Sequence, residues 1–148
     1  MVLDQTVIDE IEQVVGKGGY SLSHAVLYTY GFDASIYHNT PDIVIQPTST
    51  EQVSALMKIA SKHHIPVVPR GAGTGLCGAA VPIKGGMILA MQKMNKIVRL
   101  SVADLWVDVQ AGCVYNDLNA ELAKYGFFFP PSPGSAEACQ VGGMVATN

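Results

Sequence analysis

The sequence predicts a mixed α+β (α/β) chain, in which a strand–helix–strand unit is followed by a subdomain of mainly antiparallel strands. Between residues 43 and 68, short β-branched runs flank a stretch with the periodicity of an amphipathic helix. After residue 87, short apolar runs follow one another closely without that periodicity. The 148 residues are 49% hydrophobic, enough for a substantial core, and fit one domain or part of one.

An amphipathic helix is predicted at the start of the chain. Thr6 and Asp9 have the spacing of a capping box, and Val7 and Ile11 recur on one helical face. Glycines after residue 15 end this helix. The next stretch, up to residue 40, predicts ordered loops and one short helix, with Asp33 and its neighbours bonding the backbone in a turn.

A compact βαβ unit with parallel strands is predicted next. Ile43–Ile45 is a short β-branched strand. A helix begins at Thr48 or Ser49, each with capping-box spacing, and ends near Lys62. The apolar run Ile65–Val68 is the second strand.

The later elements are predicted from shorter patterns. Three short strands without helical periodicity favour antiparallel pairing: Met87–Met91, Ile97–Leu100 and Leu105–Gln110. A further helix is expected over Tyr115–Lys124, because leucines recur at helical spacing and a glycine follows.

Composition excludes several classes of function. Nine Lys+Arg against 12 Asp+Glu give a net charge of −3 without a basic cluster, so no nucleic-acid partner is expected. No apolar run is long enough to cross a membrane, and the first residues do not resemble a signal peptide. Three scattered cysteines form neither a disulfide framework nor a metal motif, which favours a reducing compartment.

A glycine-rich loop follows the second predicted strand. Gly71, Gly73, Gly75 and Gly78 allow the backbone to approach a ligand closely, so that successive N–H groups converge on a phosphate or diphosphate. The alternative is a tight surface turn. Arg70, directly before the loop, has two open roles: it pairs with a phosphate, or it bonds loop carbonyls.

Two familiar nucleotide motifs fail on context. Gly73–Gly78 matches GxGxxG, but Pro82 interrupts any long helix and Lys93 stands where the ribose-binding acid is expected. A Walker A loop is excluded because Ala79, rather than lysine, follows the last glycine. The loop therefore binds phosphate by another architecture.

From about residue 30 to the end, the sequence resembles the FAD-binding PCMH-type domain of the vanillyl-alcohol oxidase superfamily. Within it, the pattern Gly-Thr-Gly-Leu-x-Gly is most similar to the glycolate oxidase flavin subunit and D-lactate dehydrogenase group. The resemblance rests on ordered blocks: Tyr30–Ser35, Pro41–Pro47, Pro66–Gly75, Ser132–Ser135 and Val141–Asn148.

The resemblance implies an incomplete domain. Residues 1–40 would be an N-terminal helix and loops, and residues 41–148 the N-terminal part of the FAD-binding PCMH-type domain. The C-terminal cap domain is absent, and with it the substrate-binding arginine, the histidines and any metal ligands. No catalytic residue and no metal site is therefore assigned in this chain.

The resemblance also implies the cofactor site. FAD lies between two subdomains and is non-covalent, because Thr74 stands where members with covalent FAD carry a histidine. The diphosphate is held from one side and the cofactor is contacted from the other. The residues implied are Arg70, Gly71, Ala72, Gly73, Thr74 and Gly75 on the first side, and Ser135, Gly142, Gly143 and Asn148 on the second.

The family chemistry implied is oxidation of a small 2-hydroxy acid, such as glycolate or D-lactate, with FAD accepting the hydride. Two alternatives stay open: a flavoenzyme for a carbohydrate or an enolpyruvyl sugar nucleotide, and a non-catalytic fragment. We expect the fragment alone to be inactive. The electron acceptor is unassigned, the expected location is cytoplasmic, and peripheral attachment of the full-length protein to the inner membrane stays open.

Overall fold

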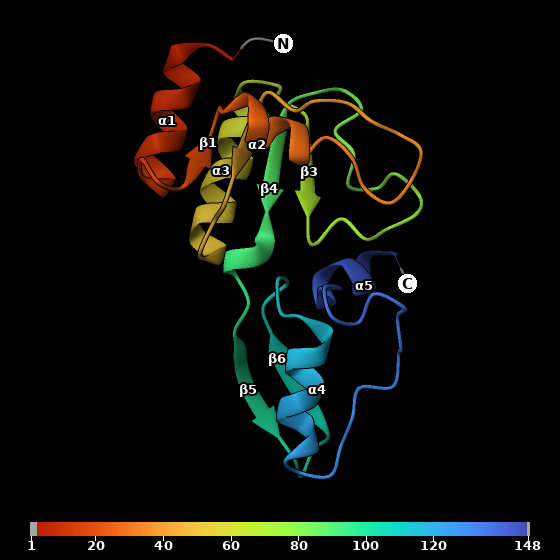
Figure 1. The fold of residues 1–148 in the computed structure, drawn as a ribbon. Helices are drawn as coiled ribbons and strands as arrows, with labels where there is room; N and C mark the ends of the chain where they lie inside the picture. The colour runs from red at the N-terminus through yellow and green to blue at the C-terminus, as the bar shows by residue number, and fades with distance from the viewer. Residues whose placement is uncertain (1–2, 148) are drawn as a thin grey trace.

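The chain forms two lobes that meet at one junction (Figure 1). The structure is a computed structural model, and it describes residues 3–147. The first lobe contains α1 (Gln5–Val15), β1 (Tyr20–Ser21), α2 (His24–Thr29), β2 (Ile43–Ile45), α3 (Thr50–Lys62), β3 (Val67–Arg70) and β4 (Met87–Ala90). The turn η1 (Met91–Lys93) leads to the second lobe, which contains β5 (Ile97–Ser101), β6 (Trp106–Val109), α4 (Tyr115–Ala123) and α5 (Val141–Thr147).

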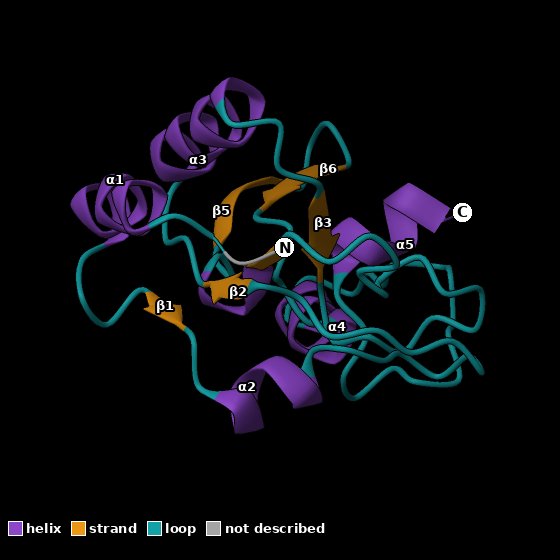
Figure 2. Cartoon of the chain, turned by 90° about the horizontal axis from the view of Figure 1, so that it is seen from above, coloured by secondary structure: helices purple, strands orange, loops and turns teal. Residues whose placement is uncertain are grey.

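The first lobe is a sheet covered on both faces. Its strand order is β1-β2-β4-β3, with β2, β4 and β3 parallel and β1 antiparallel to β2. Ile43 and Ile45 pack with side chains of α1 and α3, whereas Val44 packs with α2 on the opposite face. Figure 2 shows α1 and α3 on one side of the strands and α2 on the other. Because both faces are covered, every residue of β2 and β4 is buried.

The placement of β4 corrects the sequence prediction. Met87–Met91 was expected in the antiparallel set, but β4 lies between β2 and β3 and is parallel to both. The predicted βαβ strands are therefore parallel without being neighbours. The reason is burial: all four residues of β4 are apolar and covered on both faces, the pattern of a central parallel strand.

Two local boundaries also differ from the prediction. The second strand begins at Val67 rather than Ile65, because the Ile65 amide donates to Ala60 O at 2.9 Å at the end of α3. The N-cap of α1 is Asp4, whose carboxylate accepts from the Thr6 amide at 3.4 Å, so the capping box expected at Thr6 is wrong. The cap of α3 is confirmed at Ser49, which accepts from the Gln52 amide at 3.3 Å.

The second lobe confirms the predicted hairpin and helix. β5 and β6 pair antiparallel, and α4 contributes Leu118 and Leu122 to a core completed by Val141 of α5. The sequence did not predict α5, because Gly142 and Gly143 are weak helix formers. The fold class is confirmed: a lobe with parallel strands followed by a lobe with an antiparallel pair.

Candidate functional site

The glycine-rich loop leaves the carboxyl end of β3 and runs beside α5 at the junction of the lobes (Figure 1). A pocket of about 430 Å³ opens there. Its wall brings together three segments distant in sequence, including five of the predicted cofactor residues. The lining residues are Phe32, Asp33, Ala34, Arg70, Ala72, Gly73, Thr74 and Ser135.

The backbone amides of the loop are free to donate hydrogen bonds to a ligand. Within residues 3–147, none of the five N–H groups of residues 71–75 donates a hydrogen bond. The loop is held instead by its carbonyl oxygens: Gly71 O accepts from Gln92 Nε2 at 2.9 Å, and Gly75 O accepts from the Ala34 amide at 3.1 Å. Gly73 has φ +74°, a conformation that favours glycine. A run of free N–H groups on a pocket wall suits a phosphate or diphosphate anion.

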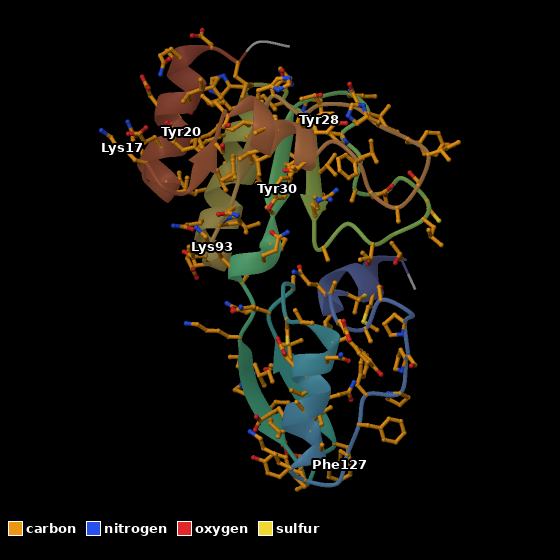
Figure 3. The ribbon with its side chains drawn as sticks, viewed as in Figure 1. Lys17, Tyr20, Tyr28, Tyr30, Lys93 and Phe127 are labelled. Atoms are coloured by element: carbon orange, nitrogen blue, oxygen red, sulfur yellow. The ribbon has the colours of Figure 1, made fainter. Side chains whose placement is uncertain are left out.

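Arg70 is buried beneath the loop. Its Nη1 donates to Phe32 O at 2.7 Å, and its guanidinium carbon lies 5.3 Å from the centre of the Tyr30 ring. Figure 3 shows Tyr30 in the first lobe, beside β4. Burial lowers the pKa of Arg70, and the neighbouring Asp33 carboxylate opposes that shift. Of the two roles left open for Arg70, the structure shows the bond to a carbonyl.

The residues from Phe32 to Ser35 are here called the aspartate turn. All but Ser35 line the pocket, and sequence reasoning missed this wall. Its internal bond was predicted and is confirmed: Asp33 Oδ1 accepts from the Ser35 amide at 2.9 Å. Its place against the loop was not, although the residues stand in the first block of the family resemblance. The contacts cross about 40 residues of chain, so no local pattern reports them.

Asp33 is buried, with its Oδ2 outside any hydrogen bond of regular geometry in the described part of the chain. Burial alone would raise the pKa of its carboxyl. The hydrogen bonds from Ser35, the Ala80 amide and the charge of Arg70 outweigh burial, so that pKa lies below its ordinary value. Asp33 is therefore ionised near neutral pH, and Arg70 contributes a Coulombic attraction without a direct ion pair between the two described side chains.

The second predicted segment reaches the pocket only in part. Ser135 lines it. Gly142 has its amide committed to Ala111 O at 2.9 Å, and a Cβ there would lie 2.7 Å from Ala111 Cβ, so the close packing of α5 requires this glycine. Gly143 is exposed, with open space where a side chain would stand. Asn148 lies outside the described residues.

Gln140 and Gln92 also touch the loop and were not predicted. Gln140 is buried, and its Oε1 lies 3.0 Å from where a Cβ on Gly71 would be. Together they contact the loop around Gly71 at the junction of the lobes.

Two other kinds of feature are absent from residues 3–147. No cluster of three His, Cys, Asp or Glu side chains there could hold a metal, and no helix there is long and apolar enough to cross a membrane.

Comparison with known families matches residues 41–148 to the FAD binding domain. The chain belongs to this family. FAD is therefore the cofactor of the domain, and the family resemblance, which rests on the ordered blocks from about residue 30 to the end, is confirmed.

The chain is similar to part of two curated relatives. It is 34% identical over 148 residues to the glycolate oxidase subunit GlcD of Bacillus subtilis, covering 99% of this chain and 32% of that protein. It is 44% identical over 108 residues to a D-lactate dehydrogenase of Anaerostipes hadrus, covering 73% of this chain and 22% of that protein. The chain thus spans a third or less of these relatives.

Solved structures share the fold. An alkyldihydroxyacetonephosphate synthase superposes with a TM-score of 0.90 at 24% identity, over 98% of this chain and 32% of that one. A p-cresol methylhydroxylase superposes with a TM-score of 0.74 at 21% identity, over 84% of this chain and 26% of that one. The expected PCMH-type fold is confirmed.

Proposed function

We propose that the protein carrying this chain is an FAD-dependent oxidoreductase that oxidises a 2-hydroxy acid of the glycolate or D-lactate class. The observation that carries the cofactor site is the run of uncommitted amides at residues 71–75 beside a pocket of about 430 Å³. The substrate class is supported by relatives named glycolate oxidase and D-lactate dehydrogenase.

The residues present fit the diphosphate of FAD. Residues 70–75 contain one cation and no acidic side chain, and Gly71, Ala72 and Gly73 leave the backbone accessible. The carboxylate that lines the pocket, Asp33, accepts a hydrogen bond from the Ser35 amide, and the positive charge of Arg70 helps to lower its pKa. In this proposal the loop amides hold the diphosphate, while Ser135 and Gly143 lie on the other side of the cofactor.

FAD, when bound, supplies the acceptor for the hydride that leaves the substrate α-carbon. The described residues supply binding and orientation, and we assign none of them to proton transfer. We infer that the FAD is non-covalent, because Thr74 offers a weakly nucleophilic hydroxyl at the loop position. We also infer a cytoplasmic location, since Cys77, Cys113 and Cys139 are free thiols.

The test is to express the full-length protein and follow its flavin absorbance. We expect a yellow protein whose flavin is bleached anaerobically by glycolate or D-lactate, with L-lactate as the matched control. A colourless protein that FAD cannot reconstitute would contradict the cofactor site. Bleaching by an aldose and by no hydroxy acid would contradict the substrate class alone.

A further inference from the structure

The glycine-rich loop is fastened to the aspartate turn at both of its ends. At the start, Arg70 Nη1 donates to Phe32 O at 2.7 Å. At the other end, the Ala34 amide donates to Gly75 O at 3.1 Å. All five amides of residues 71–75 lie between these two bonds, so the turn sets the shape of the segment that presents them.

Arg70 also supports the middle of the loop. A Cβ on Gly73 would collide with Nη2 and Cζ of Arg70, so the guanidinium lies directly against the backbone of that residue. One edge of the planar group donates to Phe32 O while its carbon lies over the Tyr30 ring. An ammonium group on a flexible stem cannot reproduce these contacts together.

The guanidinium of Arg70 is held by the protein on more than one side. Its Nη1 donates to Phe32 O, and its carbon lies over the Tyr30 ring. Asp33, which is also buried, adds a smaller Coulombic attraction. Because these contacts fix the orientation of the guanidinium beneath the loop, we expect the geometry of Arg70 to matter more than its charge.

We propose that Arg70, with Asp33, is a positioning residue that holds the amides of residues 71–75 in their binding shape rather than a direct phosphate ligand. This inference rests on the proposed FAD function and adds separate roles to it. The backbone of residues 71–75 binds the diphosphate, and Arg70, with Asp33, holds that backbone in its conformation. It predicts that a lysine at position 70 fails as badly as a neutral side chain.

The experiment uses the full-length protein with the substitutions Arg70→Lys and Arg70→Met. FAD affinity is measured by flavin fluorescence, and hydrogen–deuterium exchange of the Ala34 amide, which donates to Gly75 O, is followed in the cofactor-free protein. We expect both variants to bind FAD at least tenfold more weakly and to exchange this amide faster. The matched control is Arg99→Met: Arg99 lies 5.4 Å over the Trp106 ring and bonds Asp108, but on the second lobe. It should leave FAD affinity unchanged.

Other outcomes overturn the proposal. Affinity retained by Arg70→Lys and lost by Arg70→Met would show a direct charge contact with the phosphate. Affinity retained by both would show that Arg70 is dispensable. If neither variant folds, Asp33→Asn decides, because it keeps an acceptor for the Ser35 amide and removes the charge facing Arg70. Weaker FAD binding with faster exchange of the Ala34 amide supports the proposal, and unchanged binding rejects it.

The same data separate this proposal from the function on which it rests. If the wild-type protein does not bind FAD, the proposed function fails. Exchange of the Ala34 amide in the cofactor-free variants still reports whether Arg70 holds the loop against the aspartate turn.

Discussion

Replacing Gly73 with alanine tests the loop geometry at its most constrained point. Gly73 has φ +74°, and its missing Cβ is the space that the Arg70 guanidinium occupies. The left-handed conformation costs an alanine about 1–2 kcal/mol. Displacing Arg70 from Phe32 O costs about 1.5–3 kcal/mol more, the range for a hydrogen bond to a charged group. The two together amount to about 2.5–5 kcal/mol.

Part of this cost will be relieved by rearrangement of the loop, so we expect FAD affinity to fall at least tenfold, or about 1.4 kcal/mol. The assay is titration of FAD into the cofactor-free full-length protein. Gly126→Ala is the matched control, because Gly126 has φ +80° but nothing within 4 Å of a Cβ, and it lies away from the pocket. It should cost only the conformational part, seen as a lower melting temperature with unchanged FAD affinity. A Gly73→Ala protein that binds FAD within threefold of wild type would refute the reasoning.

Three further predictions concern other parts of the chain. Acid precipitation of the holoprotein should release all of its flavin into the supernatant, because we propose that Thr74 forms no covalent bond to the flavin; flavin that stays with the pellet would count against this. Gly142→Ala should lower the melting temperature by an overpacking cost of about 1–3 kcal/mol, since its Cβ would press on Ala111; an unchanged melting temperature would show that α5 moves freely. Glu10 accepts hydrogen bonds from Lys62 at 2.8 Å and His63 at 3.2 Å, and the bond from Lys62 is the main cause that lowers its pKa. A carboxyl group whose pKa is lower in the folded than in the unfolded protein stabilises the fold at pH values above its unfolded pKa, which is about 4.3. The wild type should therefore be more stable than Glu10→Gln at neutral pH. This difference in stability should vanish as the pH falls through the pKa of folded Glu10. A difference that persists in acid, in melting curves across pH, would reject this assignment.

The elements with strong local patterns could be predicted from sequence. α1 and α3 carry long apolar faces, and Ser49 caps α3 as its spacing indicates. The glycine-rich loop was found because its glycines follow a strand, and the pocket indeed opens beside it. Local chemistry was enough for these features.

What could not be predicted depends on contacts between distant residues. β4 enters between β2 and β3 after a crossover without a helix, so nothing near residue 87 indicates its neighbours. Likewise the aspartate turn meets the loop through Arg70 and Ala34, across about 40 residues. Gly142 was predicted as a cofactor contact, but its amide is used within the fold, which only the packing of α5 reveals.

The central claim is that the backbone amides of residues 71–75 donate hydrogen bonds to the diphosphate of FAD. The most direct measurement is a crystal structure of the full-length protein with FAD bound. The account predicts diphosphate oxygens about 2.7–3.2 Å from several of these nitrogens, with Arg70 still bonded to Phe32 O. A diphosphate held elsewhere, with these amides facing solvent, would contradict it.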